Sequence, residues 1–247
     1  LMQAVTTGAT PFRLNLHVGD VGHTLVFGPT GAGKSTLLAM LLAQARRYRS
    51  RFAKPDGTYQ PASITAFDKG RSLYTLCHAT GGTHYDIGSD DHPLALFPLA
   101  EIDTDSDALW AEEWLATAYE LQAQRPPSPQ QKAEIHRAMR LLRDAPRQQR
   151  SLTDFVATVQ DSEVRDALNH YTISGAMGHL LDGNQDTLSL SSFTVFEIDE
   201  LMKMGDANAI PVLLYLFRRF EKSLTGQPSI LSLDEAWVML GHPVFRE

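Results

Sequence analysis

Hydrophobic and polar residues alternate with a strand period near the start of the chain and then change to a helical pattern. Residues 12–18, FRLNLHV, alternate apolar and polar side chains, the pattern of a half-buried strand. Residues 19–22, GDVG, predict a turn into a second strand, HTLVFG, at 23–28. Residues 34–48 are apolar almost all round, which predicts a helix packed between a sheet and other elements.

Strand and helix patterns alternate again on both sides of a long helical block. The predicted strands are SITAFD at 63–68, THYDIG at 83–88, SFTVFEID at 192–199 and SILSLD at 229–234. Helices are predicted at 68–79, after a turn, and at 208–224. This alternation predicts an α/β fold with a mainly parallel sheet and helices on both faces.

The middle of the chain has helical periodicity and few strand signals. We predict an all-helical insertion, residues 103–185, within a core formed by residues 1–102 and 186–247. The breaks between its helices are RPPSP and DAPRQQR. The predicted helix starts are Ser106, Ser128, Ser151 and Ser162.

A glycine-rich motif, GPTGAGKS, lies between the second predicted strand and its helix. It fits the phosphate-binding pattern G-x-x-x-x-G-K-[ST] (Walker A), in which backbone N–H groups and a helix N-terminus surround the phosphates. We expect Lys34 to reach the β- and γ-phosphates and the Ser35 hydroxyl to ligate Mg²⁺. The predicted nucleotide-binding residues are Gly28, Pro29, Thr30, Gly31, Ala32, Gly33, Lys34, Ser35 and Thr36.

Two adjacent acids follow the last predicted strand and supply the second half of such a site (Walker B). Asp234 is expected to orient Mg²⁺ and Glu235 to polarise the attacking water, which points to ATP hydrolysis. Asp199 and Glu200 form a rival pair after another apolar run. We favour Asp234 because Glu197 interrupts the rival run, whereas ILSLD contains only a serine.

Three further features leave alternatives open. Asp68 lies at the end of a predicted strand, where it either supports the site or caps the helix that follows. Cys77, the only cysteine, is interpreted as a small buried side chain in a protein of a reducing compartment. An arginine series in the helical block is either a solvated face or a stripe that binds nucleic acid or a partner: Arg137, Arg140, Arg143, Arg147 and Arg150.

Composition excludes several classes of protein. A hydrophobic fraction of 43% and a charged fraction of 21% are ordinary for a soluble globular protein. No apolar run is long enough to span a membrane, and no secretory leader is visible. The net charge of −7 argues against a surface devoted to nucleic acid. Because Leu1 and Met2 have no initiation context, we expect the N-terminus to have been cut.

Several segments together resemble a known family. They are FGPTGAGKSTLLAMLLAQARRY, FDKGRSLYTL, LALFPLAEID, IPVLLYLFRRFE and LDEAWVMLGHPVFRE. The resemblance is to the conjugal-transfer ATPases of the TrbE/CagE type, the VirB-class ATPases of type IV secretion systems. It runs in order over nearly the whole chain, and FDKGRS is far more specific than the phosphate motif.

This resemblance implies a RecA-like P-loop NTPase that carries an all-helical subdomain and uses ATP and Mg²⁺. Lys34 and Ser35 match the family's phosphate and magnesium positions, and Asp234 and Glu235 match its hydrolytic pair. The family is implied to form a homo-hexamer at the cytoplasmic face of the bacterial inner membrane, with other secretion-channel and pilus components. The expected function is therefore an ATP-hydrolysing motor that energises pilus assembly and substrate transfer.

Alternatives to this function remain at the level of sequence. A DNA-translocating ATPase of the HerA/FtsK or coupling-protein kind would share both motifs, so direct DNA contact stays open. The family's N-terminal domain, its glutamine sensor and its arginines beyond the acid pair are missing, so we expect a fragment of a motor domain. Such a fragment is expected to be weakly active, or to serve only in binding or assembly. Arg71 and Arg218 are candidates for an arginine that completes a neighbouring subunit's site.

Overall fold

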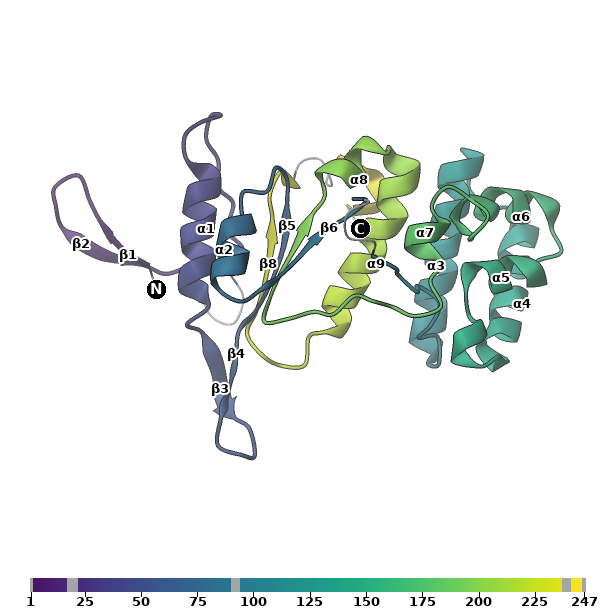
Figure 1. Ribbon diagram of the computed structural model, residues 1–247, viewed down its shortest axis with the longest axis horizontal. Helices are drawn as coiled ribbons and strands as arrows, with labels where there is room; N and C mark the ends of the chain where they lie inside the picture. Colours follow the sequence, from purple (N-terminus) through teal and green to yellow (C-terminus); the bar gives the residue numbers. More distant parts are fainter. Residues whose placement is uncertain (1, 17–21, 90–93, 237–240, 246–247) are drawn as a thin grey trace. The chain divides into compact units, whose positions relative to one another are not determined.

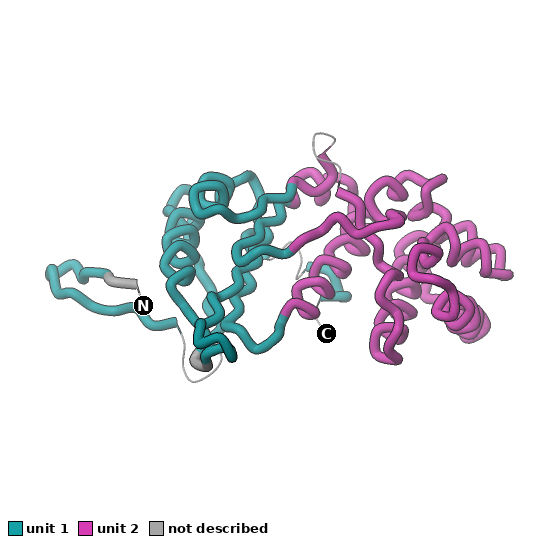
Figure 2. The backbone as a smooth tube through the Cα atoms, turned by 60° about the horizontal axis from the view of Figure 1, so that its bottom comes forward, with its two compact units in different colours: residues 1–85, 190–197, 224–247 teal, residues 86–189, 198–223 magenta. Residues whose placement is uncertain are grey.

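The computed structural model describes residues 2–16, 22–89, 94–236 and 241–245 (Figure 1). The chain divides into two compact units, coloured separately in Figure 2, and each is described by itself. The first unit comprises residues 1–85, 190–197 and 224–247. The second unit comprises residues 86–189 and 198–223.

A four-stranded sheet forms the centre of the first unit (Figure 1). Its middle strand β5 (Ser63–Asp68) is parallel to β7 (Phe193–Glu197) on one side and to β8 (Ser229–Leu233) on the other. The strand β6 (Thr83–Asp86) lies beyond β7. All four strands were predicted from the sequence, and their existence is confirmed.

One face of this sheet packs against two helices, α1 (Lys34–Ala45) and α2 (Tyr74–Ala79). Every second residue of β5 and β7 points to this side, as the strand period requires. Cys77 is fully buried there, as expected, and its burial raises the pKa of the thiol. The core residues on this face are Leu42, Ala45, Ile64, Ala66, Leu73, Cys77, Phe193 and Val195.

The end of α1 shows which way this helix runs along the sheet. Arg46, its C-cap residue, donates from Nη2 to the Thr80 carbonyl at 2.9 Å, and its guanidinium carbon lies 5.8 Å from the centre of the Phe193 ring. Phe193 is the first residue of β7, so the C-terminus of α1 lies at the amino end of the strands. A helix of 12 residues is about 18 Å long, which matches the length of these strands. Lys34 therefore lies at the carboxyl edge of the sheet.

Two antiparallel hairpins complete the first unit. In the first, β1 (Met2–Val5) pairs with β2 (Pro11–Leu14), which overlaps the strand predicted at 12–18. In the second, β3 (Arg49–Ala53) pairs with β4 (Tyr59–Pro61), and neither strand was predicted. The turn predicted at 19–22 lies mostly outside the described residues.

The strand predicted at 23–28 is wrong. The structure shows no strand in this segment, and its Leu25 and Phe27 side chains are 70% and 84% exposed. A strand is stable only when neighbouring strands take its backbone hydrogen bonds. No other described strand pairs with this segment, so the alternating pattern alone does not produce a strand.

The second unit is helical. The helix starts predicted at Ser128 and Ser151 are confirmed, and both serines form capping boxes. The helix predicted to start at Ser162 begins there, with Asp161 as its N-cap residue. The start predicted at Ser106 is wrong, because Thr104 is the N-cap residue and the helix begins at Asp105. The α-helices are α3 (Asp105–Ala123), α4 (Pro129–Asp144), α5 (Leu152–Thr158), α6 (Ser162–Leu168), α7 (Gly178–Leu181), α8 (Asp199–Lys203) and α9 (Asp206–Lys222).

Short 3-10 turns complete the assignment: η1 (Arg147–Gln149), η2 (Asn169–Tyr171) and, in the first unit, η3 (Pro243–Phe245). Helices α3 to α7 fall within the predicted insertion at 103–185, and the compact unit also takes in residues 86–102, α8 and α9. None of the described helices is both long and apolar enough to cross a membrane.

A proline inside α9 explains how this helix is joined to the rest of its unit. Pro211 has no N–H, so the Ala207 carbonyl four residues earlier loses its helical donor. The Tyr171 hydroxyl donates to that carbonyl at 2.6 Å. Trp114, which is buried, donates from Nε1 to the Pro211 carbonyl at 2.9 Å. Both bonds fix α9 to the helical block.

We predict that Tyr171→Phe lowers the free energy of unfolding by about 1 kcal/mol, because it leaves the half-buried Ala207 carbonyl without a donor. In a Pro211→Ala background the amide of residue 211 supplies the missing donor, so the cost of Tyr171→Phe should fall below half. Urea unfolding of the four proteins in this cycle measures the coupling. Equal costs in both backgrounds would contradict the assigned role of Tyr171.

Candidate nucleotide-binding site

The glycine-rich loop at 28–33 turns back on itself before α1 begins. Gly31 and Gly33 have φ of 81° and 83°, the left-handed region that favours glycine. The Ala32 amide donates to the Pro29 carbonyl at 3.2 Å, and the Lys34 ammonium donates to the same carbonyl at 3.0 Å. Left-handed residues within a tight loop make successive N–H groups converge, which is the arrangement of anion-binding nests.

The start of α1 adds two groups to this loop. Gly33 is the N-cap residue and provides no side-chain cap, so the first amides of the helix remain available to a ligand. The Ser35 hydroxyl makes no hydrogen bond with the residues that the structure describes. Residues 28–33 and Thr36 are exposed, whereas Lys34 and Ser35 are half-buried.

Three carboxylates lie in register at the carboxyl edge of the sheet. Asp68 of β5 is in register with Glu197 of β7. On the other side, Phe67 is in register with Leu233, and the Asp234 amide continues the ladder by donating to the Phe67 carbonyl at 2.8 Å. Side chains in register on parallel strands point to the same face, about 4.8 Å apart between strands. Because Ala66 and Val195 pack against α1 and α2, the three carboxylates lie on the face that these helices cover.

The inner two carboxylates are buried, and both bind the turn that follows β5. Glu197 accepts hydrogen bonds from the Gly70 amide at 3.0 Å and the Arg71 amide at 2.5 Å. Asp68 accepts from the Ser72 hydroxyl at 2.6 Å and the Leu73 amide at 2.8 Å. Of the two interpretations of Asp68, capping of the next helix is therefore observed.

Asp234 is different, because its side chain is half-buried and not fully buried. Burial raises the pKa of its carboxyl, the neighbouring Asp68 carboxylate raises it further, and the Lys34 ammonium acts in the opposite direction. Lys34 and Asp234 therefore lie within electrostatic reach of each other. Among the described residues, the Asp234 carboxylate accepts one hydrogen bond, from the Glu235 amide at 3.1 Å.

Glu235 follows directly, and its backbone is unusual. Its side chain is exposed, and its φ of 53° lies in the left-handed region that non-glycine residues rarely adopt. Such conformations cluster at functional sites, where the surroundings hold them in place. The sheet thus places Asp234 at its carboxyl edge, and the exposed Glu235 follows directly.

The rival pair has other partners. Asp199 and Glu200 begin α8 in the second unit, and both form ion pairs with Lys203 at 2.8 Å. These hydrogen bonds raise the pKa of the Lys203 amine. Lys203 already compensates one of the two negative charges of this pair, which favours Asp234 as the metal ligand.

The donor set of the first unit fits Mg²⁺. Mg²⁺ prefers oxygen ligands and usually takes one or two carboxylates together with substrate phosphates and water. Ser35 and Asp234 supply a hydroxyl and a carboxylate, and neither is saturated by hydrogen bonds from the described residues. No group of three or more histidine, cysteine or acidic side chains able to hold a metal occurs in the described part of the chain, so a dedicated all-protein site is not observed there.

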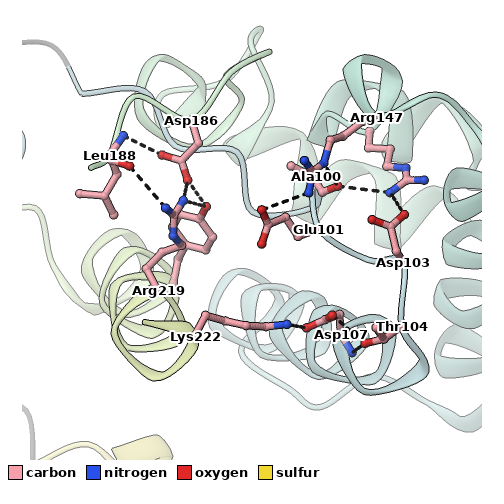
Figure 3. A network of polar contacts seen from close by, with 12 residues as sticks. Ala100, Glu101, Asp103, Thr104, Asp107, Arg147, Asp186, Leu188, Arg219 and Lys222 are labelled. Atoms are coloured by element: carbon pink, nitrogen blue, oxygen red, sulfur yellow. Dashed lines mark hydrogen bonds and ion pairs between the residues drawn. The ribbon is translucent and has the colours of Figure 1, made fainter. Parts of the chain in front are cut away.

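Most of the arginine series in the helical block is paired within its own unit, and Figure 3 shows Arg147 beside Glu101. The pairs are Arg137–Glu134 at 2.7 Å, Arg143–Asp105 at 2.7 Å, Arg147–Glu101 at 3.0 Å and Arg150–Asp103 at 2.7 Å. Only Arg140 of the five makes no ion pair with the described residues, and it is exposed. The series therefore serves mainly to bind helix ends and loops together, and its interpretation as a nucleic-acid stripe loses support.

Arg218 also has an internal role. It lies over the Trp110 ring and pairs with Asp107 at 2.7 Å and Glu221 at 2.6 Å. Lys222 forms a further ion pair with Asp107, which Figure 3 shows at the start of α3. Burial opposes ionisation of Asp107, but hydrogen bonds from Lys222, Thr104 and Arg218 outweigh it and lower the pKa to about 2. Arg218 is thus held inside its unit.

Comparison with known proteins places these features in context. No family model matches the chain. It is 52% identical to a probable conjugal transfer protein TrbE of Sinorhizobium fredii, over 100% of this chain and 36% of that protein. It is 51% identical to the conjugal transfer protein TrbE of Rhizobium radiobacter, over 100% of this chain and 29% of that protein. The chain thus spans about a third of the length of the curated relatives it matches.

More distant similarity extends to a second group of proteins. The type IV secretion system protein virB4 of Bartonella quintana is 25% identical over 98% of this chain and 30% of that protein. The solved structure of VirB4 of Thermoanaerobacter pseudethanolicus matches with a TM-score of 0.60 and 18% identity, over 85% of this chain and 60% of that chain. This likeness confirms the predicted α/β, RecA-like fold class.

We predict that substitutions in the two acid pairs have different effects on Mg²⁺-dependent nucleotide binding. Asp234→Asn should weaken Mg²⁺-dependent binding of a fluorescent ADP analogue by roughly tenfold or more, because it removes the charged oxygen ligand. Asp199→Asn should change that binding less than about twofold, because Asp199 already pairs with Lys203. Titrations with MgCl₂ and with EDTA measure both variants, and the opposite ranking would assign the site to Asp199.

Proposed function

Because this chain belongs to the family of TrbE and VirB4 proteins, we propose that it contains the nucleotide site of an ATP-hydrolysing motor for conjugal transfer or type IV secretion. One observation carries this proposal. The start of α1 with its glycine-rich loop and Asp234, about 200 residues apart in sequence, both lie at the carboxyl edge of one sheet. A loop for phosphate next to a carboxylate for a hard cation is what phosphoryl transfer requires.

The residues of the site have distinct tasks in this proposal. The amides of the loop and of the start of α1 bind the phosphates, and the Lys34 ammonium moves from the Pro29 carbonyl to their oxygens. The Ser35 hydroxyl and the Asp234 carboxylate hold Mg²⁺, which when bound neutralises charge on the β- and γ-phosphates.

Glu235 has the proton-accepting task. A water oxygen attacks the γ-phosphorus, and the bond from that phosphorus to the β,γ-bridging oxygen breaks. The proton released from the water passes to the Glu235 carboxylate, and ADP leaves with the electron pair of the broken bond. Its exposed position directly after Asp234 suits this task.

The assembly proposed for the whole protein rests on its relatives. Their names refer to conjugal transfer and to type IV secretion. We propose that the whole protein forms a homo-hexamer. It would act with secretion-channel and pilus components at the cytoplasmic face of the inner membrane. The DNA-translocating alternative gains no support, because four of the five arginines in the helical series are paired internally.

We predict opposite effects for two single substitutions. Lys34→Ala should weaken binding of a fluorescent ADP analogue by more than about tenfold, because it removes the cation that meets the phosphates. Glu235→Gln should keep nucleotide binding and slow hydrolysis by about 100-fold or more, because it removes the proton acceptor.

The measurements are equilibrium titration and analysis of the nucleotide that each protein retains after incubation with MgATP. Glu235→Gln should retain ATP, whereas the unmodified chain should retain ADP. If Glu235→Gln retains ADP at the unmodified rate, Glu235 is not the proton acceptor. If the unmodified chain binds no nucleotide, the proposed function is wrong.

A further inference from the structure

The row of carboxylates at the sheet edge contains one acid that the proposed chemistry does not use and that has an unusual position. Asp68 is fully buried and stands in register between Glu197 and the position of Asp234. Like charges directly opposite each other on neighbouring strands are destabilising. A buried carboxylate in such a row therefore needs compensation.

Hydrogen bonds compensate two of the three acids. Both oxygens of Glu197 accept backbone amides, and both oxygens of Asp68 accept donors from the same turn. Asp234 has only the Glu235 amide as donor among the described residues. The charge of the row is thus least compensated at Asp234.

The two inner acids also hold the turn in a conformation that it would not adopt alone. Gly70 and Arg71 have φ of 87° and 58°. A non-glycine residue in the left-handed region is strained, and the two hydrogen bonds that Glu197 accepts from the Gly70 and Arg71 amides offset this strain. Because its oxygens are engaged by Ser72 and Leu73, Asp68 cannot swing out to become a metal ligand itself.

We propose that Asp68 is a positioning residue for the Mg²⁺ site: its fixed, buried carboxylate beside Asp234 strengthens binding of the cation through charge, without touching it. This inference rests on the proposed function of the same site. Without a cation, the Asp68 and Asp234 carboxylates repel each other in a half-buried position, and a bound divalent cation turns this repulsion into attraction. The electrostatic repulsion between the two neighbouring carboxylates is therefore relieved when the metal binds.

The substitution Asp68→Asn separates charge from hydrogen bonding. The carbonyl of the introduced amide can accept the Leu73 N–H, and its NH₂ group can donate to the Ser72 hydroxyl, because a hydroxyl both donates and accepts. The turn is therefore kept while the charge is lost. Glu197→Gln is the matched control, because its NH₂ group would face a backbone N–H and one hydrogen bond of the turn would be lost.

The experiment titrates MgCl₂ into the 247-residue chain with a fluorescent ADP analogue and records the midpoint of metal-dependent binding. Asp68→Asn should raise the Mg²⁺ midpoint about three- to tenfold. Its melting temperature in EDTA should be unchanged or higher, because a like-charge contact is removed. Glu197→Gln should lower the melting temperature and leave the Mg²⁺ midpoint within about twofold, since Glu197 lies one strand farther from Asp234.

The outcomes separate this inference from the function on which it rests. An Mg²⁺ midpoint of Asp68→Asn within twofold of the unmodified chain overturns the role of Asp68, whatever its melting temperature. The same holds if Asp68→Asn and Glu197→Gln shift the midpoint equally, because the effect then follows the turn and not the charge. If the unmodified chain binds no nucleotide, or binds it as well as Lys34→Ala does, the proposed function fails and the inference falls with it.

Discussion

The parallel register of β5 with its two neighbours is the constraint on which the candidate site depends. It sets Asp68 level with Glu197 on one side, and with the position of Asp234 on the other. A shift of one residue in either pair would move a carboxylate to the opposite face of the sheet, away from α1. The buried apolar residues of β5 and β7 fix this register, because the same shift would expose Ile64 and Ala66 to the wrong side. The same strand register therefore determines both the packing of the core and the positions of the acids.

The local half of the site could be predicted from the sequence, and the long-range half could not. The loop at 28–35 is contiguous, so the spacing of its glycines, lysine and serine is enough to predict its conformation. Asp234 and Glu235 were recognisable because an apolar strand ends there. The level row of acids was not, because the strand order 6-7-5-8 differs from the order along the chain. Asp68 and Glu197, 129 residues apart in numbering, become neighbours only once that order is known.

Two errors have the same physical origin. Residues 23–28 have a strand pattern, but the pattern describes only which side chains could face a core. It contains no information on whether another strand is present to take the backbone hydrogen bonds, and no described strand does so. The hairpin of β3 and β4 shows the converse, since its arginine-rich first strand lacks an apolar alternation and yet pairs through its backbone. The Pro-Asp-Gly turn between its strands was the signal that could have indicated it.

Compensation of buried polar groups occurs in both units and explains which charged residues remain for function. In the helical unit, arginines meet carboxylates and loop carbonyls, and the carbonyl freed by Pro211 meets Tyr171. In the sheet unit, Asp68 and Glu197 accept hydrogen bonds from the turn after β5. At the sheet edge, the described residues give Lys34 one loop carbonyl as acceptor, the Ser35 hydroxyl no hydrogen bond, and Asp234 one amide donor. Groups that folding leaves partly uncompensated retain the most free energy for a ligand. Here these groups converge on one edge, and their chemistry suits a phosphate with its cation.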